Sequence, residues 1–249
     1  MFLNFNFKKI RYALEAPLVW LGIVFFRSLK IENSANLAGK IAVFIGKKIA
    51  VSKLAINNLG KALPHLDSSQ KNLIINDMWD NLGRVIGEFP HVCKMSADEI
   101  LEHVEIDENS RKILDDLIAK NQGGIIFSAH FGNWEIGPKI LLNYGLKVKT
   151  FYRPLNNPFV EKMTSSLRGV KMIEKGSEGN RQLISALKNK EFIIIIKIHY
   201  LIYSYSVLLY ISAISPAPSS IVGESAIKSL LLSKRFIPSP IIILNSSKS

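Results

Sequence analysis

The sequence predicts an α/β protein in which a helical N-terminal region precedes a mostly parallel sheet built from repeated β-α units. Up to about residue 100, apolar residues recur at helical spacing. From residue 103 to 196, short apolar runs alternate with amphipathic segments, a pattern typical of a parallel sheet with helices on its faces. Two of these runs, GIIFSA and EFIIII, have the apolar character of strands buried on both faces. The 249 residues are 48% hydrophobic, so a sizeable core can form.

Residues 1–30 are predicted to form an N-terminal membrane anchor or interfacial helix. The run ALEAPLVWLGIVFF, residues 13–26, is apolar except for Glu15, and basic residues flank it on both sides. It is shorter than the ~20 apolar residues that a membrane span usually needs. Trp20 and the basic flanks suit a membrane interface. A helix buried in the protein core is the alternative, and a signal peptide is a weaker one because no clear cleavage site follows.

Residues 31–102 are predicted to be a helical region. Apolar residues at helical spacing run from residue 33 to 63 as one helix, which Pro64 ends. A second helix begins at the start signal Asp67–Ser69 and continues to Pro90.

Residues 103–196 are predicted to form the α/β core. Asn133 and Asn157 stand where helix N-caps are expected, Pro158 suits a first helical position, and Gly145 suits a helix end. In chain order we expect strand 103–106, helix 108–122, strand 124–129, helix 133–145, strand 147–152, helix 156–169, strand 171–175, helix 179–190 and strand 191–196.

Residues 197–249 form an atypical tail that does not continue this pattern. The tail contains no aspartate and one glutamate, and it is rich in Ile, Leu, Ser and Tyr with scattered prolines. We interpret it as a frameshifted reading of the gene. A second membrane segment at 201–214 is the alternative interpretation.

The charge balance restricts the choice of partner. The net charge is +12 and the pI about 9.7, which indicates a polyanionic partner: nucleic acid, an anionic membrane surface or a phosphorylated substrate. We expect no nucleic acid, because the basic residues form no aromatic-interleaved patch and no nucleic-acid motif is present. The single cysteine, Cys93, excludes an internal disulfide framework and fits a reducing compartment.

The stretch SAHFGNWEIGP, residues 128–138, contains the candidate catalytic pair. His130 is expected at the carboxyl end of a buried strand, where open α/β sheets bind ligands. Glu135 is expected in the first turn of the next helix, where a carboxylate is stabilised and could orient a histidine. His130 is therefore a candidate general base with Glu135 as its orienting partner. The structural alternatives are a hydrogen-bonded core histidine, a helix-start charge at Glu135 and a core tryptophan at Trp134.

Several motifs together resemble the lipid A biosynthesis (lauroyl/myristoyl) acyltransferases. They are AINNLGKALPHLDSSQ, MWDNLGRVIGEFPH, HFGNWE, FYRPLNNP and LRGVKMIEKGSEGNRQLISALKNKEF. The resemblance covers about residues 12–195 and implies a glycerolipid-acyltransferase-like fold. The Asp-Gln pair and the Gly-x-x-Val-Pro-Phe-Phe-Gly block that the family carries after its next strand are missing from 197–249. The chain therefore looks like a C-terminally truncated or frameshifted member.

The resemblance implies an enzyme of the inner membrane whose catalytic part faces the cytoplasm. It would move a fatty acyl group, lauroyl-like, from the phosphopantetheine of acyl carrier protein to a hydroxyl of a phosphorylated, Kdo-bearing lipid A precursor. His130 would be the base and Glu135 its charge-relay partner, with no metal and no cofactor beyond the acyl carrier. The implied substrate-binding residues are Asn133, Trp134, Arg153, Arg168 and Lys175, the last three through phosphate groups.

The sequence leaves two other interpretations of the function open. A glycerophospholipid-type acyltransferase uses a related histidine–carboxylate motif, but that family usually has Asp where this chain has Glu135. A non-catalytic, membrane-bound remnant of the lipid A family is the second, and the tail favours it.

Overall fold

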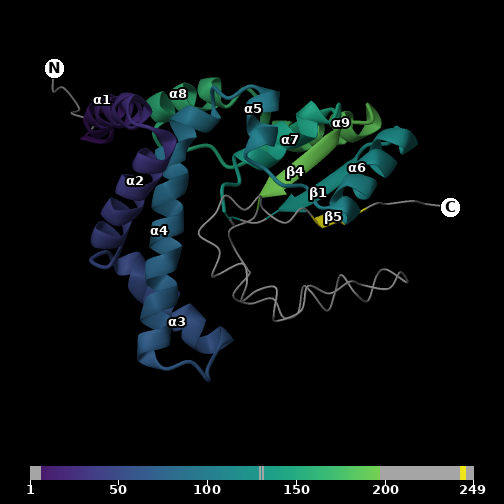
Figure 1. The fold of residues 1–249 in the computed structure, drawn as a ribbon. Coiled ribbons are helices and arrows are strands. Elements are labelled where there is room, and N and C mark those ends of the chain that lie inside the picture. The colour runs from purple at the N-terminus through teal and green to yellow at the C-terminus, as the bar shows by residue number, and fades with distance from the viewer. Residues whose placement is uncertain (1–6, 129, 131, 197–241, 245–249) are drawn as a thin grey trace, which may run out of the picture.

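A computed structural model describes residues 7–128, 130, 132–196 and 242–244 (Figure 1). The predictions for the tail, 197–249, fall outside the described residues except at 242–244. The helices are α1 (Phe7–Ser28), α2 (Ile31–Gly46), α3 (Ala50–Ala62), α4 (Ser68–Val92), α5 (Ala97–Glu102), α6 (Glu108–Lys120), α7 (Ile136–Asn143), α8 (Pro158–Arg168) and α9 (Ser177–Lys188). The strands are β1 (Gly124–Ser128), β2 (Val148–Tyr152), β3 (Lys171–Glu174), β4 (Phe192–Ile196) and β5 (Ile242–Leu244).

The sheet has the predicted parallel character. Within the described residues its strand order is β3-β2-β4-β1-β5, and every neighbouring pair is parallel except β1 and β5. Adjacent residues of β4 face opposite sides of the sheet. Ile194 joins the core formed with α6 and α7, whereas Ile193 joins Ala186 of α9. Helices therefore cover both faces of the sheet, as the alternating pattern predicts.

The strand expected at 103–106 is wrong. Residues 104–107 form a loop after α5, and no strand pairs with them. Val104 is nevertheless buried, in a cluster with Val92, Ile100 and Ile136. The alternating apolar residues thus reflect a loop packed on the core rather than a place in the sheet.

The single helix expected over 33–63 is also wrong, because the chain turns between α2 and α3. The Trp79 ring of α4 packs so closely on Gly46 that a Cβ there would lie 2.3 Å from it. The hydroxyl of Ser52 donates to the Gly46 carbonyl at 2.5 Å, and Trp79 Nε1 donates to that hydroxyl at 2.8 Å. A side chain distant in sequence therefore fixes this turn.

Helix α4 is the main support of the helical region. It begins at the predicted place, where Asp67 and Gln70 form a reciprocal capping box. It continues through Pro90 and ends at Val92, two residues beyond the predicted end. Lys139 of α7 donates to the carbonyls of Val92 and Cys93, at 2.6 and 2.9 Å, and so caps this end of α4.

Helix α1 is attached to α8 by polar contacts. Asn157, the predicted N-cap of α8, accepts from the amides of Phe159 and Val160, and its Nδ2 donates to the Tyr12 carbonyl at 2.9 Å and to Glu15 at 3.1 Å. The one charge inside the apolar run of α1 therefore has a protein partner. Among the helices that the structure describes, none is long and apolar enough to span a membrane, so the expectation of a spanning anchor finds no support in α1.

Candidate functional site

The carboxyl ends of the parallel strands form one edge of the sheet, and the candidate residues follow these ends. Ser128 at the end of β1 is aligned with Ile196 at the end of β4, and Tyr152 of β2 is aligned with Glu174 of β3. His130 follows β1, Arg153 follows β2 and Lys175 follows β3. The Lys175 amide also donates to the Tyr152 carbonyl at 2.8 Å. The sheet therefore gathers residues that are up to 45 positions apart in the sequence.

His130 has one imidazole nitrogen that is buried and unpaired. Its Nδ1 has no hydrogen-bond partner among the described residues. Burial lowers the pKa of this histidine below its usual 6.5, so the ring is neutral at pH 7. The ring lies against Trp134, with centroids 4.6 Å apart and planes tilted by 60°. A neutral imidazole held against an indole can accept a proton from a ligand at the sheet edge.

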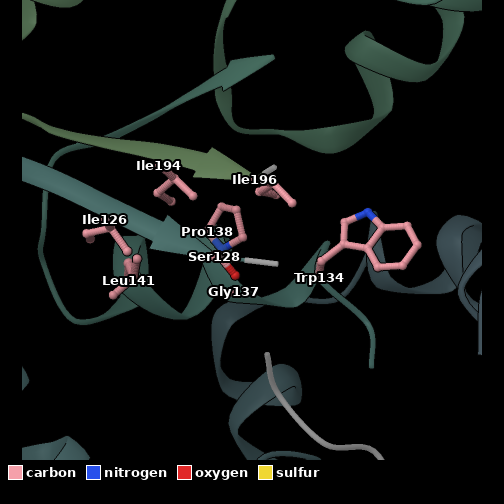
Figure 2. A pocket seen from close by; sticks show the side chains of 8 residues that line it. All are labelled: Ile126, Ser128, Trp134, Gly137, Pro138, Leu141, Ile194 and Ile196. Atoms are coloured by element: carbon pink, nitrogen blue, oxygen red, sulfur yellow. The ribbon is translucent and has the colours of Figure 1, made fainter. Parts of the chain in front are cut away.

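A small apolar hollow adjoins Trp134 (Figure 2). Figure 2 shows isoleucines from β1 and β4 on one side, Pro138 and Leu141 of α7 beside them, and Trp134 standing apart. The residues that line the hollow are Ile126, Ser128, Trp134, Gly137, Pro138, Leu141, Ile194 and Ile196. Trp134 therefore connects this hollow to the candidate base, because its ring also lies against that of His130.

Glu135 and Arg168, both predicted site residues, form a two-pronged ion pair. Arg168 Nε lies 2.9 and 3.2 Å from the two carboxylate oxygens of Glu135, and Nη2 lies 3.0 Å from Oε1. Both side chains are mostly buried, at 20% and 14% exposure for Arg168 and Glu135. The guanidinium also lies over the Phe89 ring, 5.4 Å from its centroid. Arg168 is thus paired with a protein carboxylate. The ion pair joins the loop that contains His130 and Glu135 to α8.

Asn133 holds the turn that carries Trp134 and Glu135. The predicted helix start at Asn133 is wrong, because α7 begins at Ile136. Asn133 Oδ1 instead accepts from the Glu135 amide at 3.1 Å, while its Nδ2 donates to Glu88 at 2.7 Å. This side chain therefore ties the turn after β1 to the last turns of α4.

Glu88 is a site residue that the sequence interpretation missed. It is 7% exposed, and burial raises the pKa of its carboxyl, although the Asn133 hydrogen bond and the charge of Arg84 oppose that shift. The position of Glu88 in the sequence could have indicated that it is buried and paired. Spacings of three and four residues place Glu88 on the same helix face as Val85 and Val92, both buried. An acid on an apolar face needs a buried partner.

Glu161 is a second missed residue, and it shapes the loop after β2. Its two carboxylate oxygens accept from the Tyr152 hydroxyl and from the Leu155 amide, both at 2.7 Å. These bonds close the loop that carries Arg153. The side chains of Arg153 and Lys175 are exposed, unlike that of Arg168. Among the described residues at this edge, these two cations are exposed and open to a ligand.

No metal site is evident in this part of the chain. Within residues 7–128, 130 and 132–196, no three His, Cys, Asp or Glu side chains are grouped so that they could hold an ion.

Comparison with known protein families decides the ancestry of this site. The family model described as "Bacterial lipid A biosynthesis acyltransferase" matches residues 5–208. The chain belongs to this family. The match contains α1 to β4, and hence the whole sheet edge described above. It confirms the resemblance seen in the sequence motifs. A search among curated proteins found no match.

Proposed function

We propose that this protein transfers a fatty acyl group, lauroyl-like, from acyl carrier protein to a hydroxyl of a Kdo-bearing lipid A precursor. The observation that carries the proposal is His130, a neutral histidine with an unpartnered Nδ1 at the carboxyl edge of the sheet. Family membership supplies the reaction class, since the family is one of lipid A acyltransferases.

In the proposed reaction, His130 takes the proton of the acceptor hydroxyl. The resulting oxygen nucleophile attacks the thioester carbonyl carbon of the acyl carrier, and a C–O bond forms. The C–S bond then breaks, and the phosphopantetheine thiolate receives the proton from His130. The step needs no metal and no redox partner, and the only cofactor is the acyl carrier's own arm. A base with a pKa near or below the working pH suits this chemistry.

Glu135 would serve as the anion that balances the charge gained by His130. Its pairing with Arg168 holds the loop in place. Asn133 and Trp134 would support the same loop, with Asn133 anchored to Glu88. The rigid setting of the loop is what we expect of residues that position a base.

Arg153 and Lys175 are the residues we propose for phosphate binding. Both are exposed at the ends of adjacent strands, on the same edge as His130. The phosphates of the lipid A precursor or of the phosphopantetheine arm would fit two such cations. Arg168 would contribute indirectly, because its Nε and Nη2 donate to Glu135. The net charge of +12 favours an acidic carrier protein as partner.

We place the protein at the inner membrane with its catalytic part on the cytoplasmic side. The support is α1, which exposes large apolar side chains between basic residues. Among these are Leu14, Leu18 and Trp20, each more than half exposed. A helix of this kind suits the membrane interface.

The test is acyl transfer by membranes carrying the full chain, supplied with lauroyl-carrier protein and a tetra-acylated Kdo-lipid precursor. His130→Ala should lower the rate by about 10²–10⁴-fold. His65→Ala, an exposed histidine remote from the sheet, is the matched control and should keep the parental rate. The parent's rate should rise with pH through a midpoint below 6.5, because burial lowers the pKa of His130 and only the neutral ring accepts a proton.

Two outcomes would contradict the proposal. Transfer only to glycerophospholipid acceptors would indicate the related acyltransferase class. No product with either acceptor, although the protein is present in the membrane, would identify a non-catalytic remnant of the family.

A further inference from the structure

Helices α2 and α3 present large apolar side chains to solvent. Helix α2 packs its small residues on α4, where a Cβ at Gly87 would lie 2.5 Å from the Ser34 carbonyl oxygen. The opposite side of α2 and the start of α3 form what we call the α2–α3 surface. Its exposed apolar members are Leu37, Ile41, Phe44, Ile45, Ile49, Val51 and Leu54.

The α2–α3 surface exposes more apolar side-chain area than isolated apolar residues on a protein surface would expose. Phe44 is 65% exposed, Val51 57% and Leu54 59%. On α2 the apolar positions recur every three or four residues, from Leu37 to Phe44, so they line one side of the helix. A contiguous apolar face on a folded protein marks a binding surface.

The charge around this surface is almost wholly positive. Four exposed lysines, Lys40, Lys47, Lys48 and Lys53, alternate with the apolar residues. Between residues 31 and 62 the single acidic residue is Glu32, at the start of α2. Lys48 Nζ lies 3.8 Å from the centroid of the Phe44 ring, a cation–π contact that places a positive charge directly against the apolar face.

We propose that the α2–α3 surface docks on an anionic lipid bilayer, with its apolar side chains below the headgroups and its lysines among the phosphates. Lysines near such a surface are attracted by anionic lipids, and amphipathic helices lie in this interface. A protein partner fits less well, because interface cores favour arginine and are depleted in lysine, and residues 31–62 contain five lysines and no arginine.

This contact goes beyond the proposed function, since it uses lipid as a surface and not as an acyl acceptor. It is also separate from α1, because α2 and α3 extend along α4 away from the sheet (Figure 1). Two contacts of this kind would fix the orientation of the sheet edge relative to the bilayer, whereas one helix would leave the protein free to rotate.

The experiment reports on the surface itself, independently of acyl transfer. Full-length protein carrying Phe44→Cys is labelled with an environment-sensitive fluorophore. Vesicles of three parts phosphatidylethanolamine to one part phosphatidylglycerol are then added. The matched control is Ile113→Cys on α6, where Ile113 is exposed next to Lys112 but belongs to the α/β layer. The native Cys93 should not compete for label, because burial raises the pKa of its thiol to about 11.

The label at position 44 should shift to the blue and be quenched by a lipid-borne quencher, while the label at 113 should do neither. Adding Lys40→Glu and Lys48→Glu should weaken vesicle binding by about tenfold or more, and high salt should have the same effect. A label at 44 that remains in water while the protein is vesicle-bound would overturn the proposal. So would burial of that label in a dimer formed without lipid.

Discussion

The helical region and the α/β layer use apolar residues in opposite ways. In α2 and α4, small residues form the contact and large apolar side chains such as Phe44 and Ile86 point outward. In the α/β layer, large side chains such as Ile126 and Ile193 are fully buried. Three buried polar residues there, Asn133, Asn157 and Glu161, belong to the segments that follow the carboxyl ends of β1 and β2. The comparison teaches that the helical region leaves large apolar side chains free for the proposed bilayer contact, whereas the α/β layer buries them beneath the proposed active site.

The two regions meet at the end of α4, where polar contacts surround the apolar cluster that Val92 forms with Ile136. Glu88 is bonded to Asn133, and Lys139 caps the carbonyls of Val92 and Cys93. The helical region therefore fixes the loop after β1 directly. Changes in each region should accordingly have different consequences, and the following variants separate them.

The largest effect is expected from the ion pair at the sheet edge. Arg168→Gln leaves Glu135 mostly buried without its cation, which should cost about 3 kcal/mol in the free energy of unfolding and abolish activity. Arg153→Gln is the matched variant, an exposed arginine on the same edge. It should leave the melting temperature unchanged and raise KM for the phosphorylated substrate about tenfold. Thermal unfolding and initial rates would measure both. Equal loss of stability in the two variants would contradict this division of roles.

An intermediate effect is expected where α2 and α4 touch. Gly87→Ala places a methyl group 2.5 Å from the Ser34 carbonyl oxygen and should destabilise the protein by about 2 kcal/mol. Gly22→Ala in α1 meets nothing within 4 Å and should stabilise that helix by up to about 1 kcal/mol. Denaturant unfolding of the two variants would show opposite signs. A neutral Gly87→Ala would mean that the helices can separate at little cost.

The smallest effect concerns the pH dependence of the contact between the regions. Because burial raises the pKa of Glu88 above its unfolded value, its stabilising contribution is complete at low pH and is lost as pH rises through the folded pKa. Glu88→Gln keeps an oxygen that accepts from Asn133 but cannot ionise. Relative to the parent, this variant should therefore become more stable as the pH rises from 4 to 7. Denaturant unfolding of the parent and the variant at pH 4 and pH 7 would test this prediction. The same change in the free energy of unfolding in both proteins would contradict it.

Much of the fold could be predicted because its signals are local. The cap residues Asp67 and Asn157 and the continuous apolar runs of β1 and β4 lie where the sequence places them. The exceptions have one cause. Residues 103–106 alternate like a strand, and residues 33–63 are periodic like one helix, but long-range packing decided otherwise in both cases.

The sequence by itself determined the family, the order of helices and strands between residues 108 and 196, and the position of His130 beyond a buried strand. These features depend on short patterns of residue type, which are present in the sequence before any tertiary contact forms. Only the tertiary structure decided that Glu135 pairs with Arg168, 33 residues away, and that Glu88 holds Asn133, 45 residues away. A buried charge needs a partner, but the identity of that partner depends on how distant elements come together.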